Sequence, residues 1–153
     1  MADNESTVED IGEVKAQSRG LSDGLLRIID LEGDLKEPVT SVGTCGDKDA
    51  DKFYRINSSW SLAGPPAQDL RGAMGRLSKV MPKSGWDITE HGRENSVAKS
   101  HYLKANSTER AFSVYIVVLE ASPNSGRTRP LLYVGLASDC FQVPDGQSAR
   151  DKY

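Results

Sequence analysis

Two histidines and two glutamates lie close together in the sequence and could support acid/base chemistry. His91 and His101 are the only histidines of the chain, and Glu90 and Glu94 lie on either side of His91. If the segments around the histidines pair as two strands across the turn at Gly92, the side chains of Glu90, Glu94 and His101 come within reach of one another. Carboxylates beside an imidazole are typical of general acid/base catalysis. An enzyme that uses this group is therefore one hypothesis, and exposed strand and turn side chains are the alternative.

Three aspartates repeat the opening of a calcium-binding loop. Asp47, Asp49 and Asp51 stand at alternate positions, as in the loop whose oxygens converge on Ca²⁺. The rest of that pattern is missing, because Lys52 stands where the loop needs a glycine and Ser58 where it needs a bidentate glutamate. The sequence predicts a charged surface turn here, with neither a metal site nor a cofactor site anywhere in the chain.

No other catalytic signature is present. No serine lies in a nucleophile elbow, because the G-L-S-D-G at residues 20–24 falls inside a predicted helix and not at a strand-to-helix turn. The sequence contains no P-loop and no glycine pattern that opens a helix after a strand. We therefore assign no catalytic residue. Four side chains stay as candidates for a ligand or partner surface: Trp60, Trp86, His91 and His101. For the two tryptophans burial in the core is the first expectation, because each ring covers a large area.

Cys45 and Cys140, the only cysteines, lie just before the first main strand and just after the last. Both are in polar, turn-like segments, whereas buried free thiols prefer apolar runs. If these strands share an end of the sheet, the two cysteines can form a disulfide, and closing so long a loop stabilises the fold by about 4–5 kcal/mol in the chain-entropy model. A disulfide implies an oxidising compartment. Two free thiols in a cytosolic protein are the alternative, and a cysteine metal site lacks the C-x-x-C spacing.

Composition restricts the class of partner. The 153 residues, 37% hydrophobic and 27% charged, suffice for one globular core. A net charge of −3 gives no basic surface for nucleic acid, whose binding depends on neutralising phosphates. Aromatic residues make up 7% of the chain, so carbohydrate binding stays open as an alternative that the composition does not support. No run of about 18 apolar residues occurs, so we expect no membrane-spanning segment.

Hydrophobic periodicity predicts two helices. The first begins at a cap at Ser6 or Thr7 and ends at Gly33, and the polar residues 17–20 divide it into two halves or fray its first half. The second begins at Pro65 and ends at Pro82. Its apolar face consists of Leu70, Ala73, Met74, Leu77, Val80 and Met81. Its other face is basic and predicts a solvated surface, with Arg71, Arg76, Lys79 and Lys83.

Alternating apolar and polar residues predict the strands. After a short extended piece at 39–42, a main strand covers 54–62, and an antiparallel meander follows with strands near 86–90, 97–104, 111–120 and 131–137. This order predicts an α+β fold, a two-layer sandwich in which an antiparallel sheet of four to five strands has two helices packed on one face. Ser, Thr, Lys and Asn at alternate positions keep the other face wet.

The predicted domain organisation is simple. Residues 1–6 form a disordered leader, residues 7–144 form a single α+β domain, and residues 145–153 form a C-terminal tail with too little apolar surface to fold. The opening MADNESTVED is acidic, the opposite of the basic start of a signal peptide. Two interpretations stay open: a cytosolic protein, or a chain from which an export signal has been removed.

Short motifs distributed over residues 5–144 carry a resemblance. The order is a polar leader with a long helix, a T-C-G segment, a strand ending in x-W-x-L, a helix followed by K-S-G-W, and a last strand closing with S-D-C-F. This layout is similar to small exported proteins and lipoproteins of actinobacteria. The resemblance implies a removed N-terminal lipid anchor, with residues 1–6 as its spacer, and a place on the outer side of the cell membrane. It implies no activity and no functional residue.

Three functions follow from these observations. The first is an exported, membrane-tethered, non-enzymatic domain, expected to be a monomer, that binds a protein or a cell-envelope component. The second is a carrier of a small lipid or metabolite in a cavity between helix and sheet. The third is the enzyme that uses Glu90, Glu94 and His101.

Overall fold

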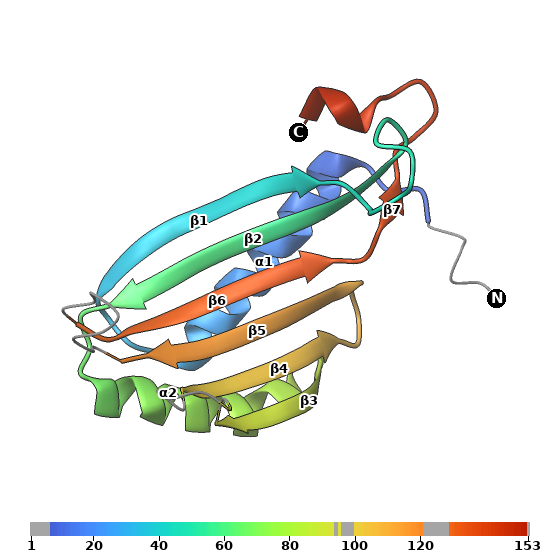
Figure 1. Ribbon diagram of the computed structural model, residues 1–153. Helices are drawn as coiled ribbons and strands as arrows, with labels where there is room; N and C mark the ends of the chain where they lie inside the picture. Colours follow the sequence, from blue (N-terminus) through green and yellow to red (C-terminus); the bar gives the residue numbers. More distant parts are fainter. Residues whose placement is uncertain (1–6, 94, 96–99, 121–128, 153) are drawn as a thin grey trace.

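The computed structural model describes residues 7–93, 95, 100–120 and 129–152. The chain forms two helices, α1 (Ile11–Ile29) and α2 (Ala67–Val80), and two short 3₁₀ turns, η2 (Met81–Lys83) and η3 (Ala149–Lys152). The strands are β1 (Asp34–Gly43), β2 (Phe53–Ala63), β3 (Trp86–Arg93), β4 (His101–Ser107), β5 (Phe112–Leu119), β6 (Leu131–Ser138) and β7 (Phe141–Gln142). The sheet is antiparallel in the order β1-β2-β6-β5-β4-β3, with β7 paired to β2. Both helices lie on one face of it (Figure 1).

The predicted α+β class, antiparallel sheet and two helices are confirmed, but the number of strands is wrong. The sheet has seven strands, not four to five. Two of them give almost no hydrophobic signal. Strand β1 is an edge strand, exposed over most of its length and bulged between Lys36 and Val39 around Pro38, where the missing amide hydrogen breaks no ladder. Strand β7 has only two residues.

Helix α1 is continuous, contrary to the division expected at residues 17–20. It begins at Asp10, whose carboxylate accepts a hydrogen bond from the Glu13 amide at 3.1 Å, so the cap is not Ser6 or Thr7. Two serines continue its buried face through the polar stretch. Ser18 is buried and donates to the Lys15 carbonyl, and Ser22 is buried and accepts from the Trp60 indole. Because both hydroxyls have partners, the helix needs no break.

The core lies between the helix layer and the sheet. Helix α2 buries most of the face that its spacing predicts, with Leu70, Ala73, Met74 and Leu77 all inaccessible. Val80, also expected on this face, is 39% exposed, because the helix ends there and the chain turns into η2. One residue of its basic face is not simply solvated. Arg76 donates to the carbonyls of Ile28 and Ile29 and so satisfies acceptors at the C-terminal end of α1. This contact fixes the two helices against each other.

The disulfide, the N-terminal segment and the C-terminal residues meet at one end of the sheet (Figure 1). Cys45 and Cys140 are bonded, with Cα atoms 6.0 Å apart, which confirms the predicted bridge. Thr7 and Glu9 bond the backbone of Gln142 in β7. The predicted leader, residues 1–6, lies outside the described residues. Within the described part of the chain, no helix is both long and apolar enough to cross a membrane.

The predicted tail is attached to the domain as far as the structure describes it. Ala149 is inaccessible, and its amide donates to the Asp51 carbonyl at 2.7 Å. The Asp51 carboxylate accepts hydrogen bonds from Arg150 Nε at 2.7 Å and from the Ser148 hydroxyl at 3.0 Å. The sequence pattern did not predict this attachment, because the attachment depends on polar contacts with a turn about one hundred residues away and not on apolar surface.

Candidate functional site

The face of the sheet that carries no helix is built from three rows of side chains that cross the strands. Strand register places one residue from each of β1, β2, β6, β5, β4 and β3 in every row, in that order. The rows are Ser41, Asn57, Ala137, Ser113, Asn106 and Asp87; Val39, Ser59, Gly135, Tyr115, Lys104 and Glu90; and Lys36, Ser61, Tyr133, Val117, Tyr102 and Gly92. We call this surface the open face.

A hollow of about 570 Å³ lies in the open face, mainly along the first two rows. Each of the strands β1 to β6 contributes to its lining, so the twisted sheet curves around it. Its polar lining consists of hydroxyl and amide groups, from Ser41, Asn57, Ser59, Asn106 and Ser113, and the rings of Tyr115 and Tyr133 stand beside them. The hollow is therefore a concave surface rich in groups that both donate and accept hydrogen bonds.

Short side chains at the centre of the sheet produce the depth of the hollow. On the open face of β6, Gly135 lies between Ser59 of β2 and Tyr115 of β5, and Ala137 lies between Asn57 of β2 and Ser113 of β5. The Tyr133 side chain folds over Gly135, since a Cβ at residue 135 would lie 3.1 Å from the Tyr133 hydroxyl. A larger residue at position 135 would push this ring, so glycine keeps Tyr133 at the wall of the hollow.

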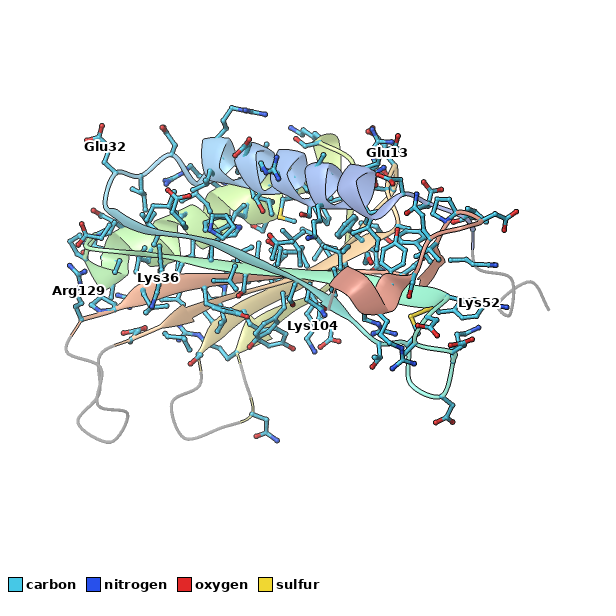
Figure 2. The ribbon with its side chains drawn as sticks, turned by 90° about the horizontal axis from the view of Figure 1, so that it is seen from above. Glu13, Glu32, Lys36, Lys52, Lys104 and Arg129 are labelled. Carbon is cyan, nitrogen blue, oxygen red and sulfur yellow. A yellow bond between two sulfur atoms is a disulfide. The ribbon has the colours of Figure 1, made fainter. Side chains whose placement is uncertain are left out.

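The electrostatics of the hollow are close to neutral. Lys104 is the one charged side chain among its described lining residues, and Figure 2 shows it on the face of the sheet opposite the helices. Its Nζ atom lies 3.9 Å from the Glu90 carboxylate and 5.8 Å from the ring centres of Tyr102 and Tyr115. Glu90 also accepts a hydrogen bond from the Tyr102 hydroxyl at 3.0 Å. The positive charge at the wall is thus matched by Glu90 and by two aromatic faces.

The acid/base group expected from the sequence does not assemble in the described residues. A bulge between Ile88 and Glu90 turns the Glu90 side chain to the open face, opposite Lys104. His101 lies on the other face, because it alternates with Tyr102 along β4. Glu90 and His101 therefore point to opposite sides of the sheet, and the hypothesis of a shared catalytic cluster fails for this pair. Glu94 lies outside the described residues.

The two histidines do meet, on the helix side of the β3–β4 hairpin. Their Nε2 atoms are 2.8 Å apart and their rings are stacked, with centres 5.0 Å apart. Burial is the main cause that lowers the pKa of His101, and the positive charges of His91, Arg93 and Arg71 lower it further. No group of three possible metal ligands occurs in the part of the chain that the structure describes. The two rings thus form a stacked, hydrogen-bonded contact that joins β3 to β4.

Acidification is expected to weaken this hairpin. Because the pKa of His101 is lower in the folded state than in the unfolded chain, the unfolded chain binds more protons, and stability falls as the pH drops below about 6.5. Melting followed by circular dichroism should show a lower Tm at about pH 5 than at about pH 7.5. In a His101→Gln variant the difference should shrink. An equal drop in the variant and the wild type would show that other groups cause it.

The aspartate turn serves the structure. Asp49 accepts from the Asp51 amide at 2.9 Å and closes the turn, and Asp51 is occupied by Arg150 and Ser148. These hydrogen bonds hold the pKa of the Asp51 carboxyl below its ordinary value. Two of the three aspartates predicted as a charged turn thus have local partners.

The two tryptophans belong to the core and not to a ligand surface. Trp60 and Trp86 are only 3% and 5% exposed. Trp60 points toward the helices and donates its indole N–H to the Ser22 hydroxyl at 2.9 Å. The first expectation for both rings, burial in the core, is therefore confirmed, and neither ring is available as a ligand surface.

The open face escaped sequence reasoning for a specific reason. Alternating Ser, Thr, Lys and Asn predicted a wet face correctly, but the same pattern fits any solvated sheet. What distinguishes the open face is that short residues and tyrosines point to the same side of the sheet. The short residues are Ser59, Ser113 and Gly135, and the tyrosines are Tyr115 and Tyr133. These residues become neighbours only when β6 lies between β2 and β5. Comparison of the chain with known protein families, with curated proteins and with solved structures found no match.

Proposed function

We propose that the chain is an exported, membrane-tethered, non-enzymatic domain that binds a component of the cell envelope through its open face. The observation that carries the proposal is the hollow, a concave surface of about 570 Å³ whose polar groups converge from six strands. Sheet twist curves this face, and the short side chains of Gly135 and Ala137 deepen it at the centre. Hollows of about 580 and 730 Å³ also lie beside α1, but their linings come mainly from helix, turn and loop residues and not from a sheet face.

Two features support export and tethering. The Cys45–Cys140 disulfide favours an oxidising compartment, where such bonds persist. The resemblance to exported lipoproteins of actinobacteria points the same way. The N-terminal segment enters the domain beside β7, at the end of the sheet that holds the disulfide (Figure 1). A tether at this end leaves the open face uncovered.

Alkylation under denaturing conditions tests the compartment. We expect both cysteines of the protein isolated from its native cells to resist alkylation until a reductant is added, as judged by intact mass. Two thiols that react at once, with the isolated protein otherwise folded, would place it in a reducing compartment and contradict export.

Site-specific photocrosslinking tests the binding surface. Photoreactive benzoylphenylalanine placed at Val39, a 67% exposed residue of the edge strand at the rim of the hollow, should form adducts in intact envelopes, whereas the same residue at Asp23, exposed on α1, should not. Excess unlabelled wild-type domain should suppress the Val39 adduct, and excess Ser59→Trp domain should not. Equal labelling from both positions, or no competition, would contradict a role for the open face.

The carrier hypothesis receives no support from the geometry. It predicts a cavity between helix and sheet, but the side chains there, among them Leu25, Met74 and Leu77, are fully buried against one another. The hollow lies on the other side of the sheet. Binding at an open surface is therefore the better interpretation.

A further inference from the structure

The chemistry of the hollow restricts what can bind there. Its first row runs across five strands as Ser41, Asn57, Ala137, Ser113 and Asn106, all with short side chains. Neighbouring strands are about 4.8 Å apart, so this row offers two pairs of hydroxyl and amide groups, Ser41 with Asn57 and Ser113 with Asn106, on either side of Ala137. Each such group both donates and accepts hydrogen bonds, which suits a ligand whose own groups do the same.

The rings beside this row add a second requirement. Tyr115 and Tyr133 lie one and two steps further along β5 and β6, at the wall of the hollow. A tyrosine ring offers an apolar face with a polar tip. A ligand that fills the hollow must therefore present C–H surface to the rings and hydroxyl groups to the polar row.

The charge and shape of the hollow disfavour three other classes of polymer. Lys104 is the one charged side chain in the described lining, and Glu90 matches it at 3.9 Å. An anionic polymer binds where cationic side chains can neutralise its charge. The described lining offers no cationic side chain that lacks an acidic partner. The exposed apolar side chain of the lining, Val39, lies on the edge strand β1 and not at the centre, where a folded protein partner places its apolar contacts. A peptide that binds by strand addition would pair with a sheet edge, not with this face.

We propose that the hollow of the open face binds an uncharged glycan chain, which lies across strands β2, β6, β5 and β4. The inference rests on the proposed function, since it names the chemical class of the envelope component. The sugar hydroxyls bond the row from Asn57 to Asn106, and the sugar rings pack on Tyr115 and Tyr133. Because the surface is open and shallow, each sugar unit adds little, and affinity rises with the length of the glycan.

Binding of defined neutral oligosaccharides tests the proposal directly. Titration of the isotope-labelled domain with hexasaccharides of glucose, mannose and N-acetylglucosamine should shift amide resonances of β2, β5 and β6 for at least one of them at about 10 mM or less. The corresponding disaccharide should bind about tenfold or more weakly. A charged oligogalacturonate and hexaglycine, titrated in parallel, should leave these resonances unchanged.

Two matched variants locate the site. Ser59→Trp fills the hollow and should weaken binding of the active hexasaccharide by about tenfold or more. Ser61→Trp makes the same change on the same face of the same strand, but residue 61 does not line the hollow. It should change the affinity by less than about twofold. Both positions are on the water side of the sheet, so both variants should fold, and their spectra will show it.

The results of these experiments distinguish failure of the glycan inference from failure of the proposed function. If no neutral hexasaccharide shifts the open face, or if both variants lose binding equally, the glycan inference is wrong. Should photocrosslinking at Val39 succeed while every glycan fails, the open face is still a binding surface, for a component of another class. If glycans and crosslinking both fail, the proposed function falls as well.

Discussion

Replacing Cys45 and Cys140 together by alanine is expected to lower the free energy of unfolding by about 4–5 kcal/mol. The bond closes a loop between residues 95 positions apart and removes that much conformational freedom from the unfolded chain. The loss is a large part of the total stability of a domain of this size, about 5–15 kcal/mol. Urea unfolding followed by circular dichroism, with and without reductant, measures it.

The same bridge also has a local role. Cys45 follows β1 and is only 7% exposed, and Cys140 lies between β6 and β7. Reduction should therefore loosen the end of the sheet where β7 meets β2, visible as faster amide exchange there than in β5. The alanine variant serves as the control, because reductant should have no effect on it. A loss below about 1 kcal/mol would mean that the unfolded chain is already compact without the bond.

The second large effect is expected from Trp60→Ala, which should cost about 3–5 kcal/mol of stability. The ring is 3% exposed, packs between β2 and the helices, and is tied to α1 through its hydrogen bond to Ser22. Its removal leaves a cavity at the place where the polar stretch of α1 is anchored. The measurement is again urea unfolding, with helix content followed separately by far-ultraviolet circular dichroism.

Two further substitutions isolate the causes. Ser22→Ala keeps the ring but leaves the indole N–H without its partner, which should cost about 1–3 kcal/mol. Ser59 precedes Trp60 in β2 but faces the opposite, open side of the sheet. Ser59→Ala should therefore change stability by less than about 0.5 kcal/mol. If Trp60→Ala cost no more than Ser59→Ala, the tryptophan would not belong to the core, and its role as a ligand surface would return.

Several parts of the fold follow from local sequence. Helix α2 begins after Pro66 and buries Leu70 and Leu77 as its spacing predicts, because helical periodicity and proline act within a few residues. Strand β2 alternates buried and partly exposed residues over its whole length. The pairing of Cys45 with Cys140 could also be predicted, since polar turns beside the first and last main strands point to one end of a sheet.

The bulge in β3 could not be predicted from the sequence. Counting by twos from Trp86 puts Ile88 and Glu90 on one face of β3. The structure inserts an extra residue at Thr89 and turns Glu90 to the open face. A single inserted residue reverses every later side chain of a strand. The predicted group of Glu90 and His101 depended on this parity, so it could not be judged before the pairing of β3 with β4 was known.

By itself the sequence determined the fold class, the disulfide, most of α2 and the existence of one wet sheet face, because each depends on residue type and short spacing. Tertiary structure decided what that wet face is. Placing β6 between β2 and β5 brings Ser59, Gly135 and Tyr115 into one row, although 76 positions separate the first two. Strand order and register are set by packing of the whole sheet, and they convert scattered polar residues into a hollow.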